Sequence, residues 1–282
     1  MSVRSARYNL LSLRNPKGLT VIPEERDAWA FLDAAKITSS RQQRAVIELV
    51  RGLKHAQLWS KMKAIYPFVG GTATTHKFNL KDPRDADAAF RLSFSGGWTH
   101  STSGAEPNGT NAYANTYLNP STQLTTSSGA FGFYCNINST PTNNDCEIGA
   151  ANADVTQAIL LYIRDLRSTQ YRTVADIGAN GTSTINEAQT SSEGFFLSKR
   201  TSSGDFKVYK NSTQIGSNTT TDPSAFPNFN IFVSAANYDG GPIQYSPKRT
   251  AFVTIGDGLT DTDATALYNI VQRFQTSLGR NV

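Results

Sequence analysis

The strongest constraint on the fold is a change in the spacing of apolar residues near Leu58. Before this point apolar residues recur at helical spacing, as Leu49 and Leu53 do. After it they alternate with polar residues, as in Phe90 and Leu92, which is the period of a half-buried strand. The chain is therefore expected to begin with helices and to continue as a β structure.

The region after Leu58 divides into short apolar runs bounded by Gly, Asn, Ser and Pro. Charged residues are only 17% of the chain, and turn-forming residues take their place. The runs expected to form strands are 89–98, 115–120, 130–136, 157–165, 171–178, 194–200, 206–218, 229–237 and 248–258. About ten short strands without intervening helices indicate a sandwich or barrel rather than a parallel α/β fold.

The first 57 residues differ in character from the rest. Residues 1–22 read as an extended basic arm without a clean period, and residues 23–57 as an αα-hairpin. Pro23 and the acidic pair after it suit a helix start, and Ser39 is a candidate N-cap for the second helix. A hairpin of this size cannot bury its apolar stripe alone, so it must pack on the β region (58–282) or on another chain.

A final helix is expected over residues 259–279. Thr260 and Asp263 form a capping-box pattern, and Gly279 stands where a C′ glycine belongs. The spacing of Leu267, Val271 and Phe274 fits either a face packed on the sandwich or a short coiled-coil seam. Packing on the sandwich is the preferred reading, because two heptads are too few for a stable coiled coil.

The charge distribution argues against a nucleic-acid partner. The net charge is +5, but the basic residues concentrate before residue 65 and the β region carries scattered charges of both signs. No nucleic-acid-binding motif is present. No stretch has the ~20 apolar residues of a membrane span, and the first residues do not form a Sec-type signal.

The two cysteines, Cys135 and Cys146, leave two alternatives open. If residues 131–136 and 146–149 paired as a hairpin, the sulfurs could meet in a disulfide. Cytoplasmic synthesis favours free thiols instead. With no His nearby in the sequence, the pair does not suggest a zinc site.

Two resemblances can be stated from longer motifs. The segments FKVYKNSTQIG (206–216), FNIFVSAAN (229–237) and FVTIGDGLTDTDATALYNIV (252–271) resemble the C-terminal half of laminin-G-like and pentraxin-like jelly rolls. The segments IYPFVGG (65–71), FNLKDPRDADAAFRLSFSGGWTHS (78–101), PNGTNAYANT (107–116) and GDGLTDTDATALYNIVQRFQTSLGR (256–280) resemble an uncharacterised family of phage and prophage proteins. The similarity runs from about residue 27 to the end.

The resemblance implies a mostly β, concanavalin A/laminin-G-like jelly-roll sandwich in a bacteriophage virion protein made in the host cytoplasm. A tail fibre, a spike or a capsid-surface appendage would fit, with other capsid or tail proteins as partners. A homo-oligomer is expected, with a trimer as the first hypothesis, because virion appendages commonly have cyclic symmetry. The arm departs from the family, and its Arg4, Arg7, Arg14 and Lys17 are candidate attachment residues.

The sequence gives no sign of an active site. A jelly-roll glucanase needs two carboxylates beside the sugar bond. No Glu after residue 60 is paired with another acid on one expected strand. Asp82, Asp85 and Asp87 lack the Gly turn of a calcium loop, so they read as turn and capping residues, although bound Ca²⁺ stays an open question. The three histidines lie apart without metal or triad spacing, so neither a metal nor a cofactor is implied.

Aromatic residues in loops are the candidate ligand contacts. Trp98 follows two glycines, and it is either a core residue or a platform for a sugar ring. Tyr113, Tyr117, Tyr238 and Tyr245 lie among Gly and Asn residues. The resulting hypothesis is a non-enzymatic virion structural protein. The alternative is a carbohydrate-binding module for host adsorption, and a glycosidase is the less favoured third.

Overall fold

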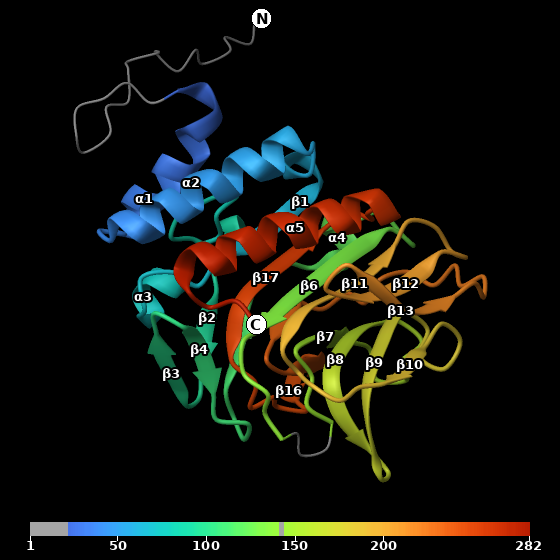
Figure 1. Ribbon diagram of the computed structural model, residues 1–282. Coiled ribbons are helices and arrows are strands. Elements are labelled where there is room, and N and C mark those ends of the chain that lie inside the picture. The colour runs from blue at the N-terminus through green and yellow to red at the C-terminus, as the bar shows by residue number, and fades with distance from the viewer. Residues whose placement is uncertain (1–21, 141–143) are drawn as a thin grey trace, which may run out of the picture.

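The computed structural model describes residues 22–140 and 144–282. Two β-sheets pack face to face, and helices from both ends of the chain cover one of them (Figure 1). This confirms the expected fold class, a mostly β jelly-roll sandwich with an N-terminal αα-hairpin and a C-terminal helix. The candidate attachment residues Arg4, Arg7, Arg14 and Lys17 lie outside the described residues.

The helices begin and end close to the expected positions. Ser39 caps the second helix by accepting from the backbone N–H of Gln42, and Thr260 and Asp263 form the expected capping box. Gly279 has a φ of 70° and ends the last helix in the left-handed conformation. The helices are α1 (Arg26–Ala34), α2 (Ser40–His55), α3 (Ala73–His76), α4 (Pro120–Gln123) and α5 (Asp261–Leu278), with 3-10 turns at η1 (Pro23–Glu25), η2 (Trp59–Lys61) and η3 (Asp87–Ala89).

One sheet has eight strands and lies next to the helices. Its order is β13-β12-β11-β6-β17-β4-β3, and β1 also pairs with β17. The strands are β1 (Met62–Tyr66), β3 (Trp98–Ser101), β4 (Gly104–Pro107), β6 (Gly129–Cys135), β11 (Gly194–Arg200), β12 (Phe206–Lys210), β13 (Thr213–Asn218) and β17 (Thr250–Gly256).

The other sheet has nine strands, in the order β10-β9-β8-β7-β14-β5-β2, with β15 pairing β7 and β16. The strands are β2 (Ser93–Ser95), β5 (Tyr113–Asn115), β7 (Ile148–Ala151), β8 (Ala158–Arg167), β9 (Gln170–Gly178), β10 (Ile185–Ala188), β14 (Phe232–Val233), β15 (Ala236–Tyr238) and β16 (Gly241–Ile243). Between the strands named here, all pairings are antiparallel except that of β15 with β7.

The expected single strand over 229–237 is wrong. Ser234 has a φ of 63° and separates β14 from β15, so the segment contributes two short strands. Its backbone N–H donates to the carbonyl of Glu147, and its hydroxyl lies 3.2 Å from that of Thr250. Contacts with residues distant in the sequence therefore hold the break.

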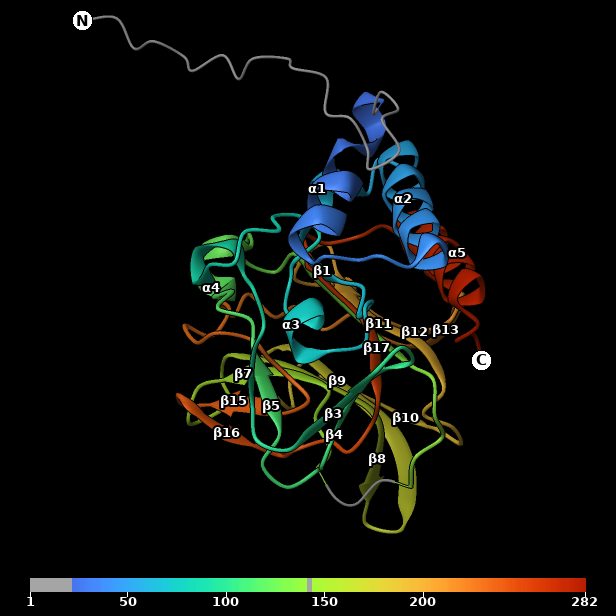
Figure 2. The ribbon, with the colours of Figure 1, turned by 90° about the vertical axis from the view of Figure 1, so that its left-hand side faces the viewer.

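The central strands β6, β11 and β17 of the eight-stranded sheet are buried on both faces, which explains their nearly continuous apolar runs. In β6, Phe131 and Phe133 point between the two sheets, whereas Ala130 and Tyr134 point toward the helices. Figure 2 shows the helices α1, α2 and α5 stacked over this sheet, with the second sheet beneath it. The molecule therefore has two main apolar layers, one between the sheets and one under the helices.

The stripes on the hairpin and on α5 are buried within the chain itself. Leu49, Leu53, Leu267 and Phe274 have at most 3% of their surface exposed, and all belong to the core under the helices. Complete burial of one such side chain contributes about 1.5–3 kcal/mol. The hairpin and the last helix thus cover the sandwich, as the preferred reading expects.

The cysteines are free thiols, and the hypothetical hairpin between their segments does not form. Cys135 ends β6 in the eight-stranded sheet, whereas Cys146 precedes β7 in the nine-stranded sheet. Each thiol is fully buried and donates to a backbone carbonyl, that of Ile137 for Cys135 and that of Ile148 for Cys146.

Candidate functional site

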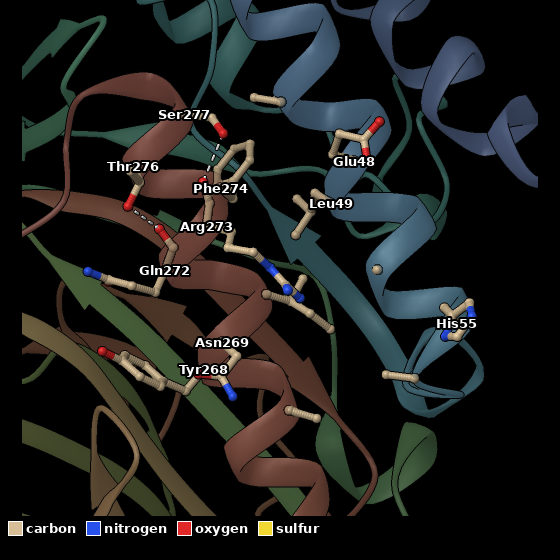
Figure 3. A pocket seen from close by; sticks show the side chains of 15 residues that line it. Glu48, Leu49, His55, Tyr268, Asn269, Gln272, Arg273, Phe274, Thr276 and Ser277 are labelled. Atoms are coloured by element: carbon tan, nitrogen blue, oxygen red, sulfur yellow. Dashed lines mark hydrogen bonds between the residues drawn. The ribbon is translucent and has the colours of Figure 1, made fainter.

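A large groove separates α2 from α5 on the helical side of the molecule (Figure 3). It encloses about 1050 Å³, and its walls include Leu49 and Phe274. The hydroxyls of Thr276 and Ser277 donate back to carbonyls of their own helix, at 2.8 and 2.9 Å, so neither is directed at a ligand. The groove lies at the seam between two helices, and its lining mixes apolar residues with the polar side chains of Glu48, His55, Asn269, Gln272 and Arg273.

A smaller pocket lies on the outer face of the nine-stranded sheet, and we call it the sheet-face pocket. Its volume is about 260 Å³. Strands β8, β9, β10 and β15 contribute to it, with residues two apart on a strand sharing the outer face. The lining residues are Val155, Leu160, Tyr162, Arg167, Val174, Asp176, Asn180, Thr184, Asn186, Tyr238 and Gln244.

Asp176 is the acidic group of this pocket. Its carboxylate accepts hydrogen bonds from the Thr184 hydroxyl and, at 3.3 Å, from the Asn180 amide. Burial raises the pKa of Asp176 from 3.8 to about 6, although the Thr184 hydrogen bond and the Arg167 charge oppose the shift. The group therefore ionises at a pH at which most aspartates are already charged.

Arg167 supplies the positive charge on the opposite side. Its guanidinium carbon lies 4.8 Å from the ring centroid of Tyr162, and its Nε lies 2.6 Å from Oδ2 of Asp165. The Arg167 side chain keeps 35% of its surface exposed, so it can still reach a ligand. The Tyr162 hydroxyl donates to Gln244 at 2.6 Å, which orients that amide in the wall.

The pocket combines an apolar base with directional polar groups. Leu160 and Val174 are nearly buried in it, and Asp176 is fully buried, while Asn180 and Asn186 present exposed amide groups. Few but well-placed polar groups over an apolar base are typical of small-ligand sites. The arrangement suits a ligand with several hydroxyls and an apolar face.

The structure does not bring the candidate aromatic residues together in one site. Tyr238 lines the sheet-face pocket, where its hydroxyl donates to the carbonyl of Ala153. Tyr245 lies near the same end of the sheet but donates to the carbonyl of Pro242 at 2.9 Å. Only Tyr238 among the candidates is a pocket residue.

The other candidates lie elsewhere. The indole N–H of Trp98 contacts the carbonyls of Ser95 at 2.9 Å and Tyr113 at 3.3 Å, and the residue is half-buried. The Tyr113 ring centroid lies 4.7 Å from that of Phe232. Tyr117 has a φ of 55° in the turn after β5. Trp98 and Tyr113 thus form part of the packing between β2, β3 and β5.

Sequence reasoning missed Asp176, Arg167 and the three amides of the pocket. A usable signal was present, because Asp176 alternates with Val174 in the run TVADIG. A carboxylate facing the same side as a core valine predicts either a partner or a site.

Sequence reasoning also missed a pair of carboxylates. Asp145 and Glu147 both contact Lys248 Nζ, at 3.2 and 3.0 Å. All three side chains have no exposed surface, so neither acid can reach a sugar in solution. The pair is therefore not an accessible hydrolytic dyad.

The remaining acidic and histidine residues do not form a metal site. Asp82 pairs with Arg84, and Asp85 and Asp87 pair with Arg91. Within residues 22–140 and 144–282, no cluster of three or more His, Cys, Asp or Glu side chains could hold a metal ion. In the same part of the chain, no helix is long and apolar enough to span a bilayer.

Comparisons with known proteins give structural likeness only. No protein-family model matches the chain, and no curated protein matches it significantly. Domain 4 of AbnA, an extracellular GH43 arabinanase of Geobacillus stearothermophilus solved with arabinotriose, has a TM-score of 0.42 at 15% identity, covering 73% of this chain and 98% of that one.

Two further similar structures are of proteins that contact glycans. A botulinum neurotoxin type C structure, described as entering cells through two ganglioside molecules, has a TM-score of 0.49 at 13% identity and covers 77% of this chain; this chain spans about half of it, 53%. The CBM40 of the Ruminococcus gnavus IT-sialidase, bound to α2,3-sialyllactose, has a TM-score of 0.39 at 9% identity and covers 50% of this chain and 82% of that one.

Proposed function

We propose that this protein is a non-enzymatic, glycan-binding β-sandwich carried on a bacteriophage virion. The sheet-face pocket is the observation that supports glycan binding. It offers hydrogen-bond donors from Arg167 and both a donor and an acceptor from the exposed Asn186 around an apolar base, with Tyr238 at its edge, while the buried Asp176 holds the Asn180 amide in place. A sugar ring has the matching features, since its hydroxyls need directional partners and its C–H face packs on apolar or aromatic surface.

The acid content of the pocket supports binding rather than hydrolysis. Glycoside hydrolysis uses two carboxyl groups, roughly 5–10 Å apart, on either side of the scissile bond. Asp176 is the single acidic residue among those that line the described pocket. Asp165, beneath Arg167, has no exposed surface. Asp176 has no exposed surface either, so a sugar in the pocket would meet no pair of carboxyl groups.

The place in the virion rests on the family resemblance of the sequence. A tail fibre, a spike or a capsid-surface appendage would present the nine-stranded sheet outward. The opposite side, where the helices α1, α2 and α5 lie (Figures 1 and 2), would face capsid or tail partners. Immunogold labelling of intact particles with an antibody to this chain tests the assignment: labelled particles are expected, and unlabelled particles would refute it.

Glycan-array binding tests the ligand class. Wild-type protein is expected to bind a defined set of glycans, and Tyr238→Ala and Asn186→Ala are expected to weaken that binding at least tenfold. Tyr117→Ala is the matched control, because it removes a half-buried tyrosine far from the pocket in sequence and outside its lining. Absence of binding to any glycan would refute the proposed function.

The same variants separate the pocket from other surfaces. If Trp98→Ala or Tyr117→Ala abolishes binding while the pocket variants retain it, glycan binding stands but the site is wrong. Release of reducing ends from host polysaccharide during incubation would refute the non-enzymatic assignment.

A further inference from the structure

A buried ionic cluster joins the two sheets at the beginnings of two inner strands, β7 and β17. Lys248 Nζ lies 3.2 Å from Oδ2 of Asp145 and 3.0 Å from Oε1 of Glu147. None of the three side chains is exposed to solvent. Asp145 and Glu147 precede β7 of the nine-stranded sheet, while Lys248 precedes β17 of the eight-stranded sheet.

The environment of the cluster holds each group in place. Ser246 donates through its hydroxyl to Oε1 of Glu147 at 2.7 Å, and the backbone N–H of Ile163 donates to Oε2 at 2.6 Å. The backbone N–H of Asp145 donates to Oδ1 of Asp165 at 3.1 Å. Two carboxyl groups and one amine are thus fixed within contact distance and away from water.

The protonation states of the side chains in this cluster suit acid–base chemistry. Burial raises the pKa of Glu147 from 4.5 to about 7, against the opposing effect of the Lys248 charge. Near neutral pH Glu147 can therefore take up and release a proton. Although burial opposes it, the charges of Glu147 and Asp145 raise the pKa of Lys248, so its amine stays charged until it gives a proton to Glu147. Excluding water also favours a condensation that releases water, and fixed neighbours react far faster than free ones.

We propose that Lys248 and Asp145 form an intramolecular isopeptide bond, with Glu147 as the proton-transfer residue. The Nζ of Lys248 attacks Cγ of Asp145, so an Nζ–Cγ bond forms and one Cγ–Oδ bond breaks. Glu147 first takes a proton from the Lys248 ammonium so that the neutral amine can attack, and it then carries this proton and a second one from the nitrogen to the departing oxygen, which leaves as water. An ammonium and a carboxylate become an amide and one water molecule, so atoms and charge balance without any cofactor or oxidant.

The bond would link the two sheets covalently across a separation of 103 residues. It would also replace a buried ion pair, whose desolvation is costly, by a neutral amide. A cross-link of this kind keeps the sheets joined when non-covalent packing fails.

Mass spectrometry of the full-length protein tests the proposal directly. The reduced and denatured wild-type chain is expected to weigh less than its sequence by the mass of one water molecule. A proteolytic digest is expected to contain a branched peptide joining the segments around Asp145 and Lys248, with no tryptic cleavage after Lys248. An unbranched digest with normal cleavage at Lys248 would overturn the proposal.

The chain provides an internal control. Lys199 is also buried and contacts Asp261 at 2.6 Å, but Asp261 is 54% exposed, so water has access to that pair. Trypsin should therefore cleave after Lys199 in the same digest. Cross-linking at both lysines would mean that burial and Glu147 are not the cause.

Three variants identify the roles of the acids. Glu147→Gln is expected to leave the chain unbranched, since the proton-transfer group is lost. Asp145→Asn is expected to react with loss of ammonia instead of water, while Asp145→Ala should show its full sequence mass. A branched Glu147→Gln chain would refute the role of Glu147. The wild-type digest decides the main proposal even if a variant fails to fold.

Discussion

His76 and His100 share a hydrogen bond between their Nδ1 atoms, which lie 2.9 Å apart. The backbone N–H of Gly71 donates to Nε2 of His76 at 3.2 Å, so the proton of a neutral His76 is on Nδ1 and points to His100. The contact connects the end of α3 with β3. The sequence expectation that the histidines lie apart is therefore wrong for this pair.

The pair predicts a loss of stability in acid. Burial, followed by the charges of His100 and Arg280, lowers the pKa of His76 from 6.5 to about 3. Because the folded pKa lies below the unfolded one, the contribution is complete above about pH 6.5 and is lost as the pH falls toward 3. The unfolding free energy is expected to change by up to about 1.4 kcal/mol per pH unit for the one proton that His76 takes up.

Urea unfolding at several pH values between 4 and 8 measures this effect. His76→Asn is expected to be less stable than wild type at pH 7 but to lose part of the acid dependence. His55→Asn is the control, because His55 is an exposed residue of α2. Equal acid dependence in wild type and His76→Asn would contradict the assignment.

Arg280 fixes the end of α5 to the sandwich. Its guanidinium donates to the carbonyls of Phe68 at 2.9 Å and of Pro67 and Ala251 at 3.2 Å, and the residue is 5% exposed. Arg280→Ala leaves these buried carbonyls without a donor, so we expect a loss of roughly 3–5 kcal/mol in unfolding free energy.

Chemical denaturation compares this variant with Arg273→Ala, in which an exposed arginine of the same helix is removed. The control should change stability by less than about 0.5 kcal/mol. Similar values for the two variants would mean that Arg280 does not fix the helix.

The positions of strands such as β6 could be predicted because apolar residues that recur at every second position, as Phe131 and Phe133 do, indicate a buried side of a strand. The break at Ser234 could not, since the groups that hold it belong to Glu147 and Thr250. The same limit applies to the sites. Asp176 looks like an ordinary strand residue until β8, β9 and β10 are placed side by side.

Because both cysteines are free thiols, we expect reducing agents to leave the stability of the protein unchanged. Cys135 and Cys146 lie in different sheets and are not bonded, so a thiol reductant should leave the melting temperature unchanged. The double Ser variant should still fold, with a modest loss of stability from polar groups in a buried setting. A loss of ~2–4 kcal/mol on reduction of the wild type would instead indicate a disulfide.

The oligomeric state remains a prediction. The stripes at Leu53 and Phe274 are covered by the chain itself, so changing them to Asp would disrupt the core rather than report on an interface. Light scattering of the wild type is the better measurement. A homo-oligomer, with a trimer as the first hypothesis, is expected to give a molar mass that is a multiple of 30.7 kDa at micromolar concentration. A measured mass of 30.7 kDa would contradict the prediction.

The last prediction concerns Asp176, whose contribution to stability has the opposite sign to that of His76. In the folded protein the pKa of Asp176 is about 6, above the ordinary value of 3.8 for an aspartate, so the folded state holds the proton more tightly than the unfolded chain does. Stability from this group is therefore complete below about pH 4 and is lost as the pH rises through 6. The shift corresponds to a loss on the order of 3 kcal/mol.

The wild-type pH profile combines these opposing contributions, so single variants are needed to separate them. Asp176→Asn removes the ionisation and should make stability rise more steeply between pH 4 and 6 than in wild type. The same variant should weaken glycan binding, because Asn180 and Thr184 lose their charged partner. Asp154→Asn is the control, since Asp154 is exposed and does not line the pocket. A profile for Asp176→Asn that matches wild type would show that burial does not hold the Asp176 proton.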